Sequence, residues 1–477
     1  MTRLAAFLAL LAGPAALGVD RSKPPAAGPP RPLRLPSVQK LALSNGLPVL
    51  LAEAHEVPVV QVTLVLRAGA TSDPRDRPGL AAFTADMLDE GAGGRDALSL
   101  ADAVDFLGAR LETGAEWDAA FASLRVPVAR LEAALPLLAD VALRPDFPPK
   151  ELERLRKEAL NDLLQARDEP ARVGSWALAL AVFGAQHRYG APLGGDARSL
   201  AAITAGGLRQ FHDRAYRPGN AALVIAGDVT SQALPLLEAA FGGWAEGGPQ
   251  GAATLASPPQ PKGRTLWLID RPGSAQSVIR IGRVAPGQPA PDQHALEVAN
   301  TLLGGSFTSR LNDNLREQHG YAYGARSLFD QRRAAGLFTA AADVQTQSTA
   351  EALAEFMKEL RRIRMPAPPD EVERARSYLA LSYAADFETT SDLAGKLAEQ
   401  WLYALPDDFY AQFVPRALAV SPSDLQKAAA ARIDPENLAI VIVGDRSRVE
   451  TKLRALGLGP LRIMTVDDVM GKAPKAD

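Results

Sequence analysis

An internal repeat limits how this chain of 477 residues can fold more than any other feature of its sequence. Residues 148–154, PPKELER, return as residues 368–374, PPDEVER, which lie 220 positions later. Residues 220–228, NAALVIAGD, return as residues 437–445, NLAIVIVGD, which lie 217 positions later. Because two independent matches share nearly the same offset, we interpret the chain as a duplication of one folding unit.

The segment between the two copies is residues 246–263, EGGPQGAATLASPPQPKG. Its Gly, Pro and Ala residues offer little to bury, which is typical of a linker. We therefore predict an N-terminal domain over residues 38–245 and a C-terminal domain over residues 264–470, each packed separately.

Each copy combines strand and hairpin signals with paired helices. In the first copy, Asn45-Gly46 predicts a hairpin turn, and the alternation over residues 59–66 predicts a strand. Apolar residues at helical spacing predict helices over residues 80–90 and 98–111. The second copy repeats this order, with strands over 264–269 and 277–284 and a helix over 292–303. The fold class predicted is α+β, with helices covering a mostly antiparallel sheet in each half.

Composition excludes several classes of function. The chain contains no cysteine, which excludes disulfides, thiolate metal ligands, a cysteine nucleophile and a lipid anchor on an N-terminal cysteine. Its formal net charge of −3 gives no electrostatic footprint for nucleic acid. At 47% hydrophobic residues, the chain is long enough to build two full cores.

The N-terminus has the pattern of a secretory signal peptide. In residues 1–18, MTRLAAFLALLAGPAALG, Arg3 precedes a short apolar run and small residues follow it. A membrane anchor is the alternative, but Pro14 and the shortness of the run argue against a full span. Residues 19–37 are rich in Pro and predict a disordered leader. We expect an exported protein, periplasmic or extracellular, with no stable membrane span.

Residues 304–327, GGSFTSRLNDNLREQHGYAYGARS, predict a helix followed at once by a strand. Ser309 is a favourable N-cap, two leucines four positions apart form an apolar face, and Gly320 is a favourable residue after the helix end. The alternation from Tyr321 onward predicts the strand. Arg316 and Tyr323 are therefore expected to converge, although an ordinary corner with a surface Arg and a half-buried Tyr fits the same residues.

The run SRLNDNLREQHGYAYGARS closely resembles the second-domain signature of the pitrilysin/insulinase metallopeptidases, peptidase family M16. In that family, an Arg and a Tyr seven residues apart line the catalytic chamber and bind the scissile peptide. Arg316 and Tyr323 match this spacing. The resemblance covers nearly the whole mature chain and implies two homologous M16-type halves, each with a mostly antiparallel sheet covered by helices.

The same resemblance shows where a metal site is expected and missing. Catalytic members carry H-x-x-E-H on the first helix of the first half, where two His bind zinc and the Glu activates water. Here Ala82, Ala85 and Asp86 stand at those positions, and the downstream ligand position falls on Asp162. The five histidines are at least 25 positions apart, so none can pair on one helix. Asp86 and Asp162 would attract Mg²⁺ or Ca²⁺ only weakly, and two solvated acids are the simpler interpretation.

Some bacterial members of the family are two-chain peptidases, in which one chain supplies zinc and the other supplies the Arg/Tyr pair. The resemblance implies that this chain is the second kind, inactive alone and without a cofactor of its own. It would close the chamber of an H-x-x-E-H partner and bind peptide through Arg316 and Tyr323. The competing hypothesis is a structural or peptide-binding protein with no part in proteolysis, which would not need both residues.

Overall fold

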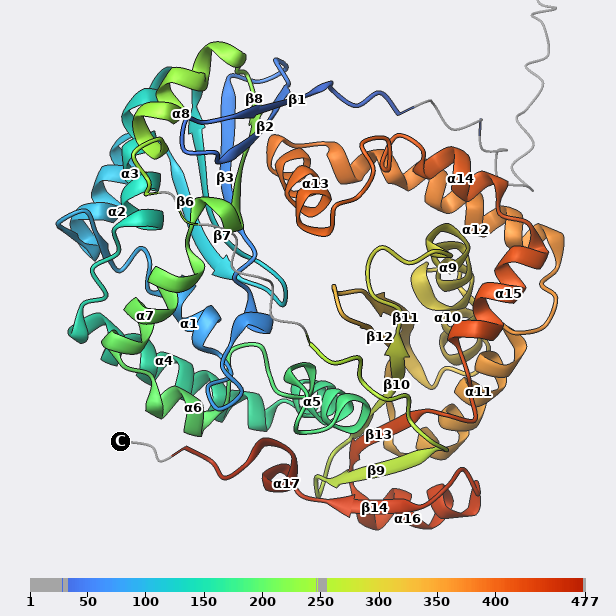
Figure 1. Ribbon diagram of the computed structural model, residues 1–477. Coiled ribbons are helices and arrows are strands. Elements are labelled where there is room, and N and C mark those ends of the chain that lie inside the picture. The colour runs from blue at the N-terminus through green and yellow to red at the C-terminus, as the bar shows by residue number, and fades with distance from the viewer. Residues whose placement is uncertain (1–27, 29–32, 246, 248–254, 475–477) are drawn as a thin grey trace, which may run out of the picture. The chain divides into compact units, whose positions relative to one another are not determined.

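Two six-stranded sheets form the framework of the protein (Figure 1). The computed structural model describes residues 28, 33–245, 247 and 255–474. The first sheet has the order β1-β2-β8-β3-β7-β6 and consists of β1 (Val38–Ala42), β2 (Pro48–Glu53), β8 (Ala221–Gly227), β3 (Val59–Leu66), β7 (Ala120–Pro127) and β6 (Arg110–Ala115). The second has the order β11-β12-β10-β13-β9-β14 and consists of β11 (Ala322–Asp330), β12 (Gly336–Gln345), β10 (Gln276–Ala285), β13 (Ala439–Gly444), β9 (Thr265–Asp270) and β14 (Leu461–Met464).

The two sheets repeat one strand order. Strands β2, β8, β3, β7 and β6 of the first sheet correspond in sequence order and position to β9, β13, β10, β12 and β11 of the second. Strand β14, from the end of the chain, takes the edge position that β1 holds in the first sheet. One pair is parallel in the first sheet and two are parallel in the second, and the remaining pairs are antiparallel. The predicted α+β class is therefore confirmed.

The helices of the first half lie mainly against the first sheet, and those of the second half mainly against the second (Figure 1). The first half contains α1 (Leu80–Asp86), α2 (Ala97–Phe106), α3 (Leu131–Leu143), α4 (Pro149–Asp168), α5 (Pro170–Phe183), α6 (Ala197–Ala202), α7 (Ala205–Ala215) and α8 (Leu234–Phe241), with a short hairpin of β4 (Gly91–Ala92) and β5 (Arg95–Asp96). The second half contains α9 (Gln293–Asn300), α10 (Arg310–Asn312), α11 (Thr349–Arg362), α12 (Pro369–Ser382), α13 (Thr390–Tyr403), α14 (Phe413–Ala419), α15 (Pro422–Arg432), α16 (Arg446–Ala455) and α17 (Val466–Met470).

Helix α2 is shorter than the helix predicted over residues 98–111. It ends at Phe106, and Gly108 follows with a φ of 62°, a left-handed conformation that glycine adopts without a steric penalty. The chain then turns into strand β6, which pairs antiparallel with β7 at the edge of the first sheet. The predicted end of the helix was wrong, because apolar residues at helical spacing continue past Phe106 into the half-buried strand β6.

Two helices are exchanged between the halves. Helix α5 belongs to the first half but packs on β10 and β13 of the second sheet, through apolar side chains that include Val173, Leu178 and Val182. Helix α13 belongs to the second half but packs on β3 and β8 of the first sheet, through Leu393 and Leu397 among others. The two helices begin at residues 170 and 390, which are 220 positions apart, so each is the repeat copy of the other.

This exchange differs from the expected separate packing of the two halves. The central strands explain it, because β8 and β13 are buried along their whole length and have apolar residues toward both faces. Helices of the same half cover one face of each sheet, and the exchanged helix covers the other. Residues from Leu33 onward accordingly belong to one unit.

The domain boundaries at 38–245 and 264–470 stay predictions, since several of the residues near them are not described. The signal peptide predicted over 1–18, most of the leader over 19–37 and part of the linker over 246–263 lie outside the described residues.

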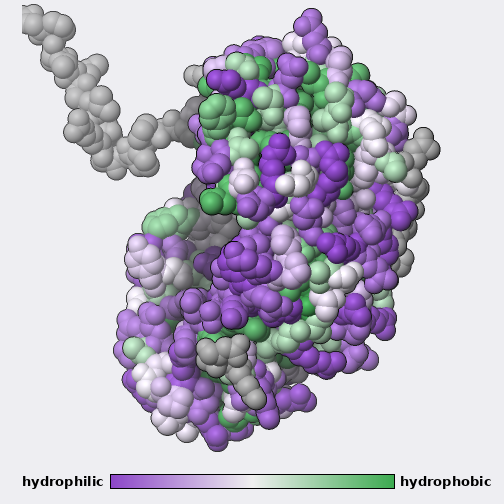
Figure 2. Space-filling model, turned by 90° about the vertical axis from the view of Figure 1, so that its left-hand side faces the viewer, coloured by the Kyte–Doolittle hydropathy of each residue, from purple (hydrophilic) through white to green (hydrophobic). Residues whose placement is uncertain are grey.

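None of the helices in the described part of the chain combines the length and the apolar character that crossing a bilayer requires. The face of the molecule seen in Figure 2 is mainly hydrophilic, and its apolar side chains occur in small groups.

Candidate functional site

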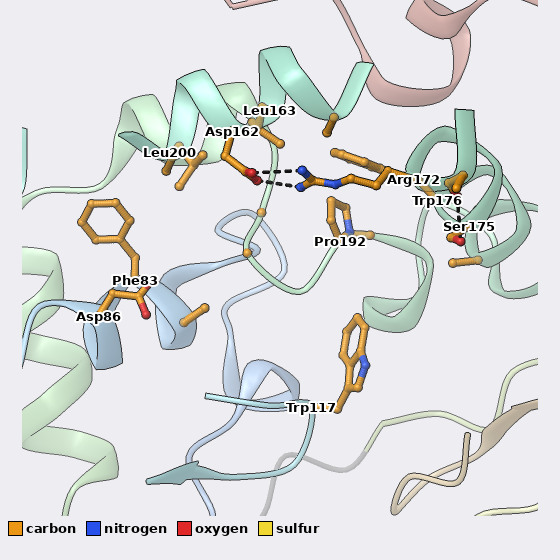
Figure 3. A pocket seen from close by; sticks show the side chains of 18 of the residues that line it. Phe83, Asp86, Trp117, Asp162, Leu163, Arg172, Ser175, Trp176, Pro192 and Leu200 are labelled. Atoms are coloured by element: carbon orange, nitrogen blue, oxygen red, sulfur yellow. Dashed lines mark hydrogen bonds and ion pairs between the residues drawn. The ribbon is translucent and has the colours of Figure 1, made fainter. Parts of the chain in front are cut away.

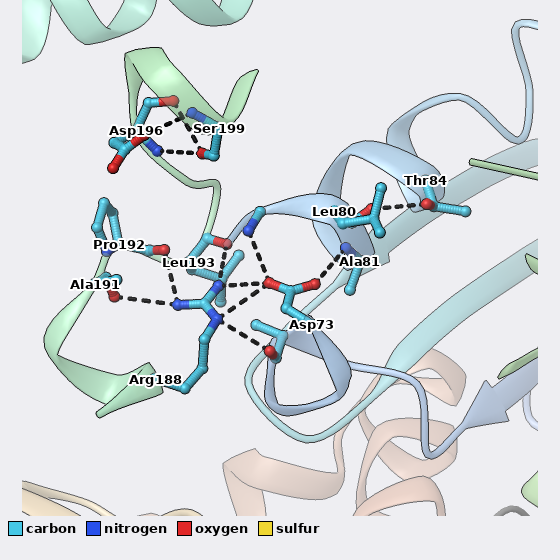
Figure 4. A network of polar contacts seen from close by, with 12 residues as sticks. Asp73, Leu80, Ala81, Thr84, Arg188, Ala191, Pro192, Leu193, Asp196 and Ser199 are labelled. Atoms are coloured by element: carbon cyan, nitrogen blue, oxygen red, sulfur yellow. Dashed lines mark hydrogen bonds and ion pairs between the residues drawn. The ribbon is translucent and has the colours of Figure 1, made fainter. Parts of the chain in front are cut away.

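Helix α1 carries three of the four positions that correspond to the family's metal site, and a buried ion pair fixes its first turn (Figure 4). Asp73 accepts hydrogen bonds from the backbone N–H groups of Gly79 and Ala81, each at 2.7 Å. Arg188 donates to the same carboxylate at 2.9 Å, and the two side chains are 7% and 0% exposed. Arg188 also donates to the carbonyl oxygens of residues 70, 192 and 193. The buried charges are thus well supplied with partners, and α1 is held in place.

A cavity of about 880 Å³ opens beside this helix (Figure 3). Ala82 and Asp86 of α1 and Asp162 of α4 line it, so the structure brings three of the four predicted positions to one cavity. Ala85, the fourth position, is 0% exposed and is not among the residues that line the cavity. Its burial follows from the packing of α1 against β6, β7 and α7.

Asp162 is already engaged by an arginine. Arg172, at the start of α5, donates from Nη1 to Oδ1 at 2.9 Å and from Nη2 to Oδ2 at 2.6 Å (Figure 3). This bidentate contact lowers the pKa of Asp162 below its usual range. The carboxylate that corresponds to the downstream ligand is therefore neutralised within the chain.

Zinc does not fit the residues at this position. A catalytic zinc site takes three protein ligands, usually including histidine. Ala82 and Ala85 offer no donor atom, and Asp162 is held by Arg172, which leaves Asp86. Within the described residues, no group of three or more His, Cys, Asp or Glu side chains is arranged to hold a metal ion.

Asp86 is the remaining ionisable group of the replaced motif. It has no hydrogen-bond or ion-pair partner among the residues that the structure describes. Partial desolvation at the cavity wall, together with the charges of Asp89 and Glu90, raises the pKa of Asp86 to about 6, although the residue is exposed to solvent. A group of this kind is protonated more readily in the folded chain than in the unfolded chain.

We predict that Asp86→Asn stabilises the chain at pH 7.5 and has no effect below about pH 4. Below that pH, Asp86 is protonated in both states. Between about pH 4 and the folded-state pKa of about 6, Asp86 ionises in the unfolded chain but stays protonated in the folded chain, so the wild-type chain loses stability that the Asn variant keeps. Because Asp86 is exposed, solvent screens this effect, and we expect a gain of no more than about 1 kcal/mol, to be measured by urea unfolding at both pH values.

The matched control for this measurement is Asp162→Asn. Arg172 lowers the pKa of Asp162, so this second change should bring no gain at pH 7.5. Equal stability of the Asp86→Asn variant and the wild type at pH 7.5 would contradict the prediction.

The predicted helix before Arg316 is present but is not a regular α-helix. It begins as α10 and continues as a π-helical turn over Asp313–Gln318, and Gly320 follows with a φ of 62°. Ser309 occupies the N-cap position, but its hydroxyl makes no cap hydrogen bond and is buried without a partner. Wide turns of this kind are frequent at functional sites, where they change the direction of side chains.

Arg316 and Tyr323 converge, as the sequence predicts. The Arg316 guanidinium carbon lies 5.3 Å from the Tyr323 ring centroid and 4.6 Å from that of Phe307, so two aromatic rings flank it. Such cation–π contacts hold the guanidinium without using its hydrogen-bond donors. Tyr323 is 89% exposed, and its hydroxyl has no partner among the described residues. The role of the pair in binding substrate stays a prediction.

A β-bulge aims Tyr323 outward. In β11, Ala322 pairs with Val344 and Ala325 pairs with Ala342. The chain thus advances by three residues on β11 where it advances by two on β12. The extra residue lies at Tyr323–Gly324, next to the edge of the second sheet. Bulges of this kind redirect side chains near functional sites, and this one presents the phenol to solvent.

Tyr323 lines a second cavity, of about 530 Å³, which sequence analysis did not find. The exposed rings of Phe307 and Tyr378 also line it. Arg280 and Arg326 line both cavities and therefore lie where the two meet. The sequence feature that could have pointed to Phe307 is a large aromatic residue in a loop of small and polar residues. Tyr378, Arg280 and Arg326 lie on three different elements, α12, β10 and β11, and no sequence spacing connects them.

Two repeated α+β halves, an outward-facing Arg/Tyr pair and a replaced metal motif define a metallopeptidase-like chain, and among its described residues the family's zinc ligands are not assembled. The chain belongs to peptidase family M16: residues 48–192 match the insulinase (peptidase family M16) domain, and residues 202–379 match the peptidase M16 inactive domain. The second match places the chain with the family's non-catalytic type of domain.

Several known proteins are similar to this chain in sequence or in fold. An uncharacterized zinc protease of Mycobacterium leprae is 28% identical over 299 residues, which cover 62% of this chain and 67% of that protein. The uncharacterized zinc protease YmxG of Bacillus subtilis is 23% identical over 359 residues, covering 74% and 85%. The crystal structure of a peptidase M16 inactive domain from Pseudomonas fluorescens is 28% identical, with a TM-score of 0.80 over 86% of this chain and 98% of that one. A protease from Helicobacter pylori, 20% identical, shares the fold with a TM-score of 0.79 over 86% and 100%.

Proposed function

We propose that this chain is the non-catalytic subunit of an exported, two-chain M16 zinc peptidase. It closes the chamber of a partner that carries H-x-x-E-H, and it binds the substrate peptide there through Arg316 and Tyr323. The observation that supports this most strongly is the arrangement of these two side chains. A purely structural chain has no use for a guanidinium that is held against two exposed aromatic rings, one of which is the phenol of Tyr323.

The pair is suited to bind a peptide carbonyl. Tyr323 presents one O–H donor, and the guanidinium of Arg316 keeps N–H donors available, since its ion pair with Glu317 at 3.2 Å uses one nitrogen. Both groups strengthen their hydrogen bonds as negative charge develops on the carbonyl oxygen. The chain thereby contributes to turnover without holding the metal, which the partner supplies.

Export is part of the proposal. The pattern of residues 1–18 is that of a signal peptide, and the absence of cysteine is compatible with an oxidising compartment. We assign the assembly to the periplasm or the extracellular space.

The test is purification of the tagged chain from its native source and, separately, alone from an expression host. Alone, the chain is expected to contain no stoichiometric zinc by metal analysis and to cleave no peptide. From the native source, a chain with H-x-x-E-H should accompany it, and the pair should cleave peptides in a chelator-sensitive manner. Zinc and activity in the isolated chain would overturn the proposal, and a partner without any peptidase activity would favour a structural or peptide-binding protein.

A further inference from the structure

A row of three residues crosses the second sheet where the two cavities meet. Arg280 of β10 and Arg326 of β11 are both in register with Ala341 of β12. Residues in register on neighbouring strands point to the same face of a sheet. The two arginines therefore flank the small Ala341 side chain, on the face that both cavities share.

Arg326 differs from the other arginines that line these cavities, because it has no carboxylate partner among the described residues. It is exposed, and it has neither a hydrogen bond nor an ion pair within the part of the chain that the structure describes. Each of the other arginines that line the cavities has a carboxylate within ion-pair distance: Arg172 with Asp162, Arg280 with Asp343, and Arg332 with Asp330. At the junction of the cavities, Arg326 consequently carries a positive charge that no ion pair among the described residues neutralises.

We propose that Arg326, with Arg280 beside it, forms a subsite over Ala341 that binds a carboxylate of the substrate peptide. The planar guanidinium group matches a carboxylate in bidentate geometry, and the alanine between the two arginines leaves room for it. The carboxylate belongs to an Asp or Glu side chain or to the C-terminus of the peptide. This inference rests on the proposed function, because it requires a peptide bound against Tyr323.

The distance along β11 fixes where the acidic group lies in the peptide. Arg326 is three positions after Tyr323, which corresponds to about 10 Å of extended strand, shortened somewhat by the bulge. In the proposed complex the peptide lies extended along β11, and an extended peptide has nearly the same rise per residue. The carboxylate is therefore two or three residues from the carbonyl group that Tyr323 binds.

The experiment measures binding of blocked, fluorescein-labelled octapeptides to the full chain by fluorescence anisotropy. Three peptides are amidated and carry Glu, Gln or Lys at one internal position, and a fourth carries Gln and a free C-terminal carboxylate. We expect the Glu peptide to bind about five-fold more tightly than the Gln peptide, and the Lys peptide to bind least. The chain has a net charge of −3, so its overall charge favours the opposite order.

The variants are Arg326→Gln, Arg326→Glu and the control Arg448→Glu. Arg326→Gln should abolish the preference for Glu, and Arg326→Glu should reverse it in favour of Lys. Arg448 is exposed on α16, away from both cavities, and its replacement changes the net charge as much as Arg326→Glu does. The Arg448→Glu variant should keep the wild-type preference. Thermal melting of each variant confirms that it is folded.

Each result has a defined meaning. A preference for the free C-terminus over the internal Glu would assign the subsite to a terminal carboxylate. Equal binding of all four peptides, or an unchanged preference in Arg326→Glu, would overturn the carboxylate subsite and leave the proposed function standing. If none of the peptides binds while the partner-bound pair still cleaves them, the subsite is wrong for this chain. If none of the peptides binds and the pair of chains cleaves none of them, the proposed function fails together with the carboxylate subsite.

Discussion

In the reconstituted pair of chains, Tyr323→Phe and Arg316→Ala are each expected to lower peptide turnover about ten-fold or more. Tyr323→Phe removes one hydroxyl from a ring that is 89% exposed, so it changes almost no packing. Removal of one preorganised donor to a developing oxyanion costs on the order of 10²–10³ in rate, and ten-fold is a lower bound for that loss. The measurement is steady-state kinetics, with size-exclusion chromatography to confirm that the pair is assembled.

Tyr321→Phe is the matched control for this experiment. Tyr321 stacks on His319 with ring centroids 4.9 Å apart and packs against the core of the second half, so its hydroxyl should matter little for turnover. A loss in kcat indicates that the contact tightens in the transition state, whereas a loss in KM indicates that it holds the substrate. Unchanged turnover in both site variants would remove their catalytic role and favour a structural protein.

Arg188→Ala is expected to destabilise the chain by about 3–5 kcal/mol. It leaves Asp73 without its counter-ion at a position that is 0% exposed, and it removes the donor that joins α1 to the loop after α5. Uncompensated buried charges account for the largest losses seen on breaking an ion pair. Urea unfolding at pH 7.5 measures the change.

Arg172→Ala provides the comparison within the same chain. Its ion pair with Asp162 has similar distances, but the two side chains are 40% and 58% exposed. Solvent screens such a pair, so its loss should cost about 1 kcal/mol or less. Similar losses for Arg188→Ala and Arg172→Ala would show that burial does not determine the strength of these pairs.

The repeat predicted much of the fold. Matches at offsets of 217 and 220 positions predict two copies of one unit, and the two sheets do share a strand order. The exchange of α5 and α13 was not predicted, because periodicity shows that a helix has an apolar face but not which sheet that face contacts. One signal was available: NAALVIAGD and NLAIVIVGD are continuous apolar runs, which indicate strands covered on both faces.

The candidate site could be predicted in part. The spacing of Arg316 and Tyr323 predicted that they converge, since a helix end and a strand start must meet. The π-helical turn and the bulge that set their geometry have no clear sequence pattern. Phe307 and Arg326 were not predicted, because their roles depend on residues that are close only in the folded chain. Phe307 contacts the guanidinium of Arg316, and Arg326 is in register with Ala341.

The exchanged helices bear on how a chamber in an assembly of this kind can open. A hinge motion between the two halves of this chain would have to pull α5 off the second sheet and α13 off the first at the same time. Burial of a single Val or Leu contributes about 1.5–3 kcal/mol, so the apolar side chains of the two helices together resist such a motion by on the order of 10 kcal/mol. The chain should therefore move as one rigid shell, and substrate entry should depend on its separation from the partner.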